Sequence, residues 1–498
     1  MAKLEGGLAA RLAIAVSFGF GILRLSVARD VGFGDSEALY ACYALHPQPA
    51  YLDHPGLIGR LALWLGHGTA PTPTQAHVFT SVAATALPWL GALAAWATGA
   101  SWSRACRVVL ALALVPEFSI GLFGLTPDLP LAFFWIGGLA FAALALRAEQ
   151  HSWTALLTSV GAGACAGAAC LSKASGAFLA LTLFAFSLTR AMRPRWRTVA
   201  PWAATALAAI LVAPVLIWEA RRGWPMLVHR IIAQAGGKLW ARNLAVLVFG
   251  QLLYVTPPFL VGAYFLLRDL WRRNRDPTDQ LLWLITIVPA LPLVALSVWS
   301  RSVEPHWIAP AYLGLAIHVA RTDAISARWS AAALAAGTAV VLAVFAWIQT
   351  PLPMRLLGNR YDARQDITND LLAWGPGRSL LKQAVEDTAF ETSQTPVVIG
   401  PHWTICAQAH AALASFGSRI PVGCNDNNQR DDFDDWLPRP AWRQNPTILF
   451  VTDSRFATTP SFPDRHVRRI SEAAIYRHEK AVRVLRIIQL DISKSAAL

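Results

Sequence analysis

The sequence predicts a multi-pass helical membrane protein that ends in a small α/β domain, and three observations support this fold class. Of 498 residues, 55% are hydrophobic and only 15% are charged, whereas soluble domains carry roughly 25% charged residues. The apolar residues gather in runs of about 20, the length that crosses a bilayer as a helix. After about residue 350 these runs cease, and charged residues, Asn, Gly and Pro return. We therefore expect an all-α membrane bundle over 1–350 and an α/β domain over 351–498.

The apolar runs predict about eleven spans. They are 7–28, 77–99, 105–124, 128–147, 154–171, 174–190, 199–218, 244–267, 279–299, 306–320 and 329–348. The first run is too long for a signal peptide and is not followed by a convincing cleavage site, so it is predicted to remain as the first helix.

Arginine-rich loops predict the orientation of these spans. Four arginines crowd 190–197 and four more crowd 268–275, and both loops lie on the same side when the spans alternate. The positive-inside rule makes that side cytoplasmic. An odd number of spans then places the N-terminus inside and the C-terminal domain outside. The net charge of +13 arises at such span ends, which favours contact with membrane lipids and argues against a nucleic-acid partner.

The C-terminal region reads as alternating short strands and helices. The β-branched runs 395–400, 447–453 and 481–490 are typical of strands, and 378–390 and 405–416 have helical apolar spacing. Cys406 and Cys424 both fall here and can pair if the domain is extracytoplasmic, so their state stays open.

A group of polar residues follows the first predicted span. The loop 30–76 contains Asp35, Glu37, Asp53 and His54 in a chain that is otherwise short of charge. Apolar residues at helical spacing predict two short amphipathic helices, over 36–46 and 55–66, lying in the outer membrane interface. Asp53 or His54 is placed to cap the second helix.

Further polar residues lie on the same predicted outer face. Asp128 sits in the tight turn "LTPDLP" and Lys173 in "LSKAS". Polar groups at membrane depth need a water-filled site or a partner, so we expect these two to converge on one cavity. Basic residues that break the positive-inside trend also lie there: Arg221, Arg222, Arg301 and His306. Simpler interpretations stay open: an N-cap for Asp128, snorkelling for Lys173, and headgroup contact for Arg221 and Arg222.

Four motifs carry a family resemblance. "DSEALY", "YLDHPGLIG", "LTPDLPLAFFW" and "CLSKASGAFLAL" occur in this order, and together they resemble glycosyltransferases of the C superfamily (GT-C). More narrowly, they are similar to the bacterial family 39 and aminoarabinose-transferase-like proteins, which are related to dolichyl-phosphate-mannose protein mannosyltransferases. The tail segments "VVIGPHWTICAQAHAAL" and "TILFVTD" follow the same pattern, so the resemblance covers most of the chain.

The resemblance implies a GT-C fold, a polyprenyl-phosphate-linked sugar donor, and catalysis by an acid of the first outer loop. Ser36 separates Asp35 from Glu37, whereas the family places the two acids side by side. Either acid can therefore be the essential one, and Asp35 is favoured. Some superfamily members require a divalent cation, Mg²⁺ or Mn²⁺, which Asp35, Glu37 and Asp128 are candidates to bind.

The expected chemistry agrees with these residue types. An acceptor hydroxyl needs a carboxylate base, and Asp35 is assigned that role, with Glu37 and Asp128 shaping the acceptor or metal site. The departing lipid phosphate needs positive charge where negative charge develops. The candidate phosphate- or substrate-binding residues are Lys173, Arg221, Arg222, Arg301, His306, Asp53 and His54. For His54, capping or hydrogen bonding to Asp53 is the simpler interpretation. One base and no evident covalent nucleophile predict a single inverting displacement.

The sequence thus predicts a bacterial inner-membrane glycosyltransferase with a periplasmic C-terminal domain. Its expected acceptor is a glycolipid such as lipid A, another envelope glycan, or a protein. One alternative is a transporter or flippase of lipid-linked sugars, for which midplane charges or interrupted repeats would be typical. Another is an inactive scaffold subunit of envelope glycan assembly, which the altered "DSE" motif favours.

Overall fold

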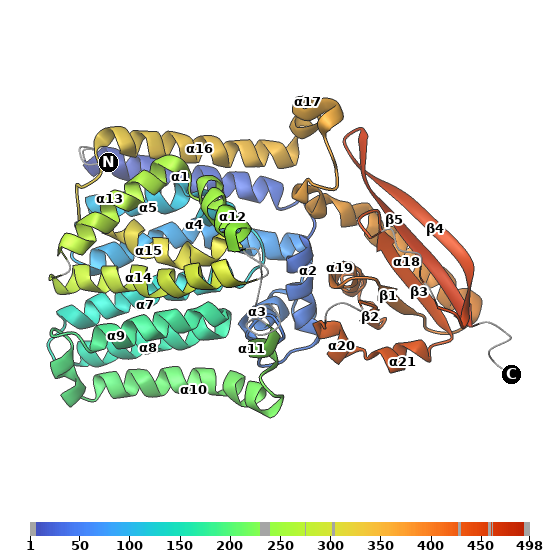
Figure 1. Ribbon diagram of the computed structural model, residues 1–498, viewed down its shortest axis with the longest axis horizontal. Coiled ribbons are helices and arrows are strands. Elements are labelled where there is room, and N and C mark those ends of the chain that lie inside the picture. Colours follow the sequence, from blue (N-terminus) through green and yellow to red (C-terminus); the bar gives the residue numbers. More distant parts are fainter. Residues whose placement is uncertain are drawn as a thin grey trace.

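The computed structural model describes residues 6–229, 240–273, 275–300, 304–426, 430–456, 460 and 462–492. Long helices lie side by side with nearly parallel axes, and a sheet with its helices sits against one end of this bundle (Figure 1). We call that end the domain end; it carries the loop 30–76, and the N-terminus lies at the opposite, far end. The predicted fold class, a helical membrane bundle with a small C-terminal sheet domain, is confirmed.

The bundle contains helices of unequal length. Seven helices in the described part of the chain are long and apolar enough to cross a membrane, and a bent pair makes an eighth. The remaining three predicted spans correspond to the shorter helices α5, α9 and α15. The bundle helices are α1 (Gly6–Val27), α4 (Pro73–Ala97), α5 (Trp102–Leu114), α7 (Asp128–Arg147), α8 (Trp153–Ser172), α9 (Ala177–Ser187), α10 (Ala200–Arg221), α12 (Trp240–Tyr254), α13 (Pro257–Arg273), α14 (Pro277–Trp299), α15 (Ala309–His318) and α16 (Ala327–Gln349).

Two predicted spans are interrupted for local reasons. Helix α5 stops at Leu114 because Val115 is extended and Pro116 cannot continue the ladder; the short helix α6 (Pro116–Ser119) follows. Helices α12 and α13 meet at 102°. At this bend Thr256 adopts a positive φ of 71°, and Pro257 then starts α13. The expected straight span 244–267 is therefore two helices.

The loop 30–76 forms the two predicted short helices, α2 (Asp35–Cys42) and α3 (Leu57–Leu65). The expectation that both lie in the lipid interface is wrong for α2. Its apolar face, including Leu39 and Cys42, packs on α19 (Trp403–Ala414) of the sheet domain, and Cys42 Sγ donates to the Ala407 carbonyl at 3.4 Å. On α3, the Trp64 side chain is 66% exposed, as expected at an interface.

The start of α3 also differs from prediction. Helix α3 begins at Leu57 and its N-cap is Gly56, without a side-chain capping bond. The predicted capping by Asp53 or His54 is therefore wrong, because both residues precede the cap and bond elsewhere.

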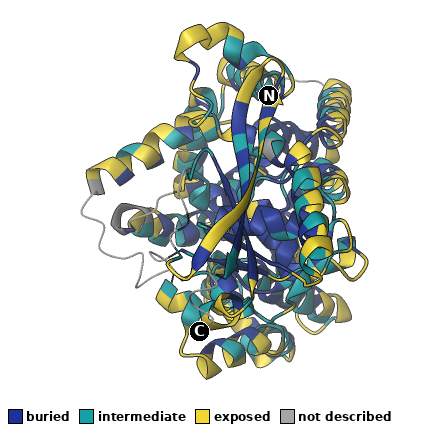
Figure 2. Ribbon diagram, turned by 90° about the vertical axis from the view of Figure 1, so that its right-hand side faces the viewer, coloured by how far each residue is buried: buried dark blue, intermediate teal, exposed yellow. Residues whose placement is uncertain are grey.

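The C-terminal sheet has the strand order β2-β1-β3-β5-β4. Strands β1 (Val397–Gly400), β3 (Thr447–Asp453) and β5 (Lys480–Ile492) correspond to the predicted strands. Sequence reasoning missed β2 (Val422–Cys424), which has only three residues. It also missed β4 (Arg465–Arg477), an edge strand most of whose residues are exposed (Figure 2) and whose charged side chains hide its apolar pattern. The predicted helices correspond to α18 (Asp370–Thr392) and α19. Cys406 and Cys424 are buried free thiols that hydrogen-bond to each other.

Candidate functional site

The predicted site residues that the structure describes gather at the domain end, but they divide between separate groups of contacts. Asp128, Lys173 and His306 form one group, which we call the lysine cluster. Asp35 belongs to a second group with Asp370, Asp453 and Arg455, which we call the arginine cluster. Glu37 belongs to neither.

The lysine cluster joins three elements that are distant in sequence. The Lys173 ammonium donates to Asp128 Oδ1 at 2.8 Å and to Oδ2 at 3.0 Å, and His306 Nε2 lies 3.4 Å from Nζ. The side chains of Asp128, Lys173 and His306 are 22%, 13% and 28% exposed. They are thus sheltered but open to a ligand. The predicted convergence of Asp128 and Lys173 agrees with this geometry.

Local structure fixes Lys173 at this position. Helix α8 ends at Ser172, and Lys173 is extended before a 3-10 turn, Ala174–Gly176. A Cβ on Gly176 would lie 2.1 Å from the Ala169 carbonyl oxygen, so only glycine permits this tight return. Asp128 is the first residue of α7 and its carboxylate binds Lys173; it is not the N-cap, a position that Pro127 takes.

Glu37 is part of the framework that connects the loop 30–76 to the bundle. Its Oε1 accepts from the Leu125 amide at 2.7 Å and pairs with His77 Nε2 at 2.9 Å, while Oε2 accepts from the Gly34 amide at 2.8 Å. Burial acts to raise the pKa of Glu37, but the His77 interaction and the backbone bonds outweigh it and lower the pKa below its ordinary value. Both oxygens are occupied, and Glu37 anchors the turn that precedes Asp128.

We expect the substitution Glu37→Gln to lower stability more than chemistry. It removes the charge that pairs with His77 inside the protein, and breaking a buried pair in this way costs about 3–5 kcal/mol. Thermal unfolding of the detergent-solubilised protein should show a lower melting temperature, with Glu149→Gln, a change at an exposed acid, as the control. A variant that melts like the wild type but is inactive would contradict this role.

Asp35 faces the sheet domain. Its Oδ2 lies 2.6 Å from Arg455 Nη1, and its Oδ1 accepts from Gln408 Nε2 at 3.2 Å. Arg455 also contacts Asp370 at 3.1 Å and Asp453 at 2.8 Å. A second guanidinium, that of Arg483, contacts Asp370 at 2.7 Å. Burial, and then the charge of Asp35, raise the pKa of Asp370. Three carboxylates thus share two guanidiniums, which leaves an excess of negative charge.

The other candidate residues make the following contacts outside the lysine and arginine clusters. Asp53 pairs with His229 at 3.3 Å, and His54 Nε2 lies 3.0 Å from the Tyr40 hydroxyl. Arg222 donates to Gln48 Oε1 at 3.2 Å, and its guanidinium lies 4.6 Å from the centre of the Trp218 ring. Arg221 is exposed at the end of α10. Arg301 lies outside the described residues.

The three acids proposed as metal ligands are directed at different partners. Asp35 binds Arg455, Glu37 binds His77, and Asp128 binds Lys173. Among the residues that the structure describes, no group of three His, Cys, Asp or Glu side chains is arranged to hold a metal ion. These residues therefore do not fit a shared divalent cation as they are placed.

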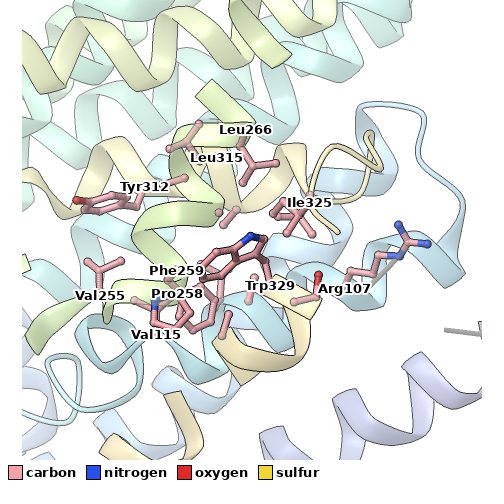
Figure 3. A pocket seen from close by; sticks show the side chains of 18 of the residues that line it. Arg107, Val115, Val255, Pro258, Phe259, Leu266, Tyr312, Leu315, Ile325 and Trp329 are labelled. Atoms are coloured by element: carbon pink, nitrogen blue, oxygen red, sulfur yellow. The ribbon is translucent and has the colours of Figure 1, made fainter. Parts of the chain in front are cut away.

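An apolar cavity lies between α5, α13, α15 and α16 (Figure 3). Tyr312 and Arg107 lie at opposite ends of it. At its domain end, the Tyr312 hydroxyl donates to Gln251 Oε1 at 3.0 Å, and Gln251 Nε2 donates to the Pro305 carbonyl at 2.8 Å. Since Pro305 precedes His306, two hydrogen bonds connect the cavity to the lysine cluster.

Sequence reasoning missed several groups at the domain end. Arg455 and Gln408 come from the distant C-terminal domain, and the cavity is lined by apolar residues from four helices, so neither leaves a local signal. Glu117 did leave one, because it is a single acid within the predicted span 105–124, and ionisable residues inside spans are functional candidates.

Comparison with known proteins identifies similar folds. Residues 63–218 match the family described as dolichyl-phosphate-mannose-protein mannosyltransferase. No curated protein matches the sequence significantly. The ArnT structure from Cupriavidus metallidurans bound to undecaprenyl phosphate is 15% identical, with a TM-score of 0.59 over 97% of this chain and 98% of that one. Its apo structure is 17% identical, with a TM-score of 0.60 over 96% and 97% of the two chains.

An oligosaccharyltransferase from Archaeoglobus fulgidus in the apo form is also similar. It is 13% identical with a TM-score of 0.51, over 89% of this chain and 70% of that one. At these identities the likeness concerns the fold, which extends over nearly the whole chain in the case of ArnT.

Proposed function

We propose that this chain, a membrane glycosyltransferase with the GT-C fold, moves a sugar from a polyprenyl-phosphate donor to an extracytoplasmic acceptor. Bound undecaprenyl phosphate in the ArnT structure supports this donor class. The family match of residues 63–218 supports a lipid-phosphate sugar as well. The proposed acceptor is a hydroxyl or phosphate group of a glycolipid such as lipid A, of another envelope glycan, or of a protein.

The observation that carries this proposal is the cavity with a charged group at one end. Isoprenoid chains are apolar and need a dry, apolar surface, whereas their phosphate needs cations. The cavity between α5, α13, α15 and α16 suits the chain, and the lysine cluster beyond Tyr312 suits the phosphate. The proposal places the chain of one amphiphilic lipid in the cavity and its phosphate at the lysine cluster.

Lys173 is the proposed phosphate ligand, with His306 beside it. When the glycosyl–oxygen bond breaks, its electron pair goes to the phosphate, which becomes a dianion. An ammonium positioned at this oxygen stabilises the transition state more than the ground state, because the charge grows during the reaction. Asp128 holds Lys173 in place before the lipid binds, at 2.8 Å.

Asp35 is the proposed base, because it lies where the loop 30–76 meets the sheet domain with its side chain 14% exposed, whereas Glu37 is buried in the framework. In this role the Asp35 carboxylate takes up the proton of an acceptor hydroxyl as the hydroxyl oxygen attacks. Attack by that oxygen on the anomeric carbon, opposite the departing phosphate, inverts the configuration. The acceptor then enters between the loop 30–76 and the sheet domain.

The proposed location is a bacterial inner membrane, with the N-terminus cytoplasmic and the sheet domain periplasmic. The arginine-rich loops 190–197 and 268–275 support this orientation through the positive-inside rule. Accessibility labelling of single cysteines introduced at each end of the bundle would test it.

Transfer by the purified protein tests the proposed activity. We expect labelled sugar to move from polyprenyl-phosphate donors into an envelope glycolipid, glycan or protein fraction, in detergent and without a membrane gradient. A flippase would instead move the donor across proteoliposome membranes without forming product, and a scaffold would do neither. Either of these results would overturn the proposal.

A further inference from the structure

Glu117 is a buried carboxyl group that the proposed chemistry does not use. It lies in α6, the short helix between α5 and the turn before Asp128. The residue is 5% exposed, and its Oε2 has no hydrogen-bond partner in the described part of the chain. A buried polar atom without a partner is uncommon in a folded protein.

Glu117 lies near both the lysine cluster and the cavity. It is within electrostatic reach of Asp128 and Lys173, and also of Tyr254 and Tyr312, of which Tyr312 lines the cavity. Helices α5, α12 and α16 pack against α6. Their charged side chains are Arg104 and Arg107 on α5, Arg242 on α12 and Arg328 on α16.

The charge state of Glu117 follows from these neighbours. Lys173 is the nearby cation, and both Asp128 oxygens already bind it. An ionised Glu117 would be a buried carboxylate beside a second carboxylate, which is a costly arrangement that carboxyl groups avoid by keeping their proton. A neutral carboxyl is a hydrogen-bond donor, and here it has no acceptor at Oε2.

We propose that Glu117 is a further ligand of the lipid phosphate and that it donates an O–H hydrogen bond to a phosphate oxygen held by Lys173. This inference rests on the proposed function, because it takes the lipid phosphate as the ligand of the lysine cluster. Glu117 supplies a donor without adding charge. Its proton stays on the carboxyl group, and the bond strengthens as the phosphate becomes a dianion.

Two neutral substitutions of similar size separate donation from packing. Glu117→Met has no donor, whereas Glu117→Gln keeps one. In purified full-length protein, we expect Glu117→Met to weaken binding of undecaprenyl phosphate about tenfold, the effect of one hydrogen bond to a charged group. Glu117→Gln should bind it within about threefold of the wild type. Binding of undecaprenol, which lacks the phosphate, should not change in either variant.

Glu219→Gln is the matched control, because Glu219 is 2% exposed, also has an unpartnered Oε2, and lies on the distant helix α10. Equal binding of undecaprenyl phosphate by wild type and Glu117→Met would overturn the inference. Equally weakened binding of undecaprenyl phosphate and undecaprenol by Glu117→Met would also overturn it, because that result indicates a packing defect. If the wild type itself does not prefer the phosphate to the alcohol, the proposed function fails too. If the wild type prefers the phosphate and Lys173→Ala removes that preference, the proposed function stands and a negative result for Glu117→Met contradicts only the role of Glu117.

Discussion

Replacing Lys173 with alanine should reduce sugar transfer by about 100- to 1,000-fold, the effect of removing one preorganised group at a developing negative charge. Lys173 is 13% exposed and contacts both oxygens of Asp128. Its loss removes the proposed phosphate ligand and leaves Asp128, an anion, facing the phosphate of the proposed lipid donor. Repulsion then adds to the loss of attraction. Initial rates with a polyprenyl-phosphate sugar measure this effect.

Lys382→Ala is the control for Lys173→Ala. Lys382 is 46% exposed on α18 and pairs with Glu386 at 3.7 Å, and surface pairs of this kind contribute little. Lys173→Arg should recover only part of the activity, because a planar guanidinium does not match the point contact that an ammonium makes between Asp128 and His306. Full activity of Lys173→Ala would remove the lysine cluster from the mechanism.

Replacing Asp35 with asparagine should reduce transfer by about 100- to 10,000-fold, the contribution of a general base. The amide keeps the size of the side chain and can still accept from Arg455, but it cannot take up a proton at neutral pH. The effect is expected in turnover, with donor binding little changed. Single-turnover rates and donor affinity, measured separately, distinguish these two quantities.

Asp370→Asn tests whether the arginine cluster acts through Asp35 or through domain contact. Asp370 shares Arg455 with Asp35 but lies on α18. If Asp35 is the base, Asp370→Asn should retain most of the activity. Equal losses in the two variants would show that Asp35 serves to attach the sheet domain, and would move the search for the base to the lysine cluster.

The sequence predicted the bundle well because crossing a bilayer imposes a simple length and polarity requirement. The prediction from the sequence was wrong where an apolar run does not form one continuous helix. Helix α5 is interrupted before Pro116 and the α12–α13 pair bends at Thr256, so a continuous apolar run became two helices. It also assigned the face of α2 that carries Leu39 and Cys42 to lipid, because composition alone cannot distinguish a lipid-facing stripe from one that packs on α19.

The candidate site was predicted in part for a similar reason. Asp128 and Lys173 sit in tight turns at one end of the bundle, and such turns must converge when helices pack. Asp35 and Glu37 were expected to share a site, but residues two apart on a helix point to nearly opposite sides. Asp35 consequently meets the sheet domain and Glu37 meets the bundle. The contact from Arg455, 420 positions away, has no local signal.

The contact between Asp35 and Arg455 has a consequence for biosynthesis. The ribosome releases the loop 30–76 before most of the bundle, whereas Arg455 emerges only after every bundle helix. Until then, the face of α2 that carries Leu39 and Cys42 has no cover and Asp35 has no counter-ion. A nascent or prematurely terminated chain therefore displays an unprotected apolar surface that proteases and chaperones can recognise. Assembly of the loop 30–76 therefore has to wait for the sheet domain.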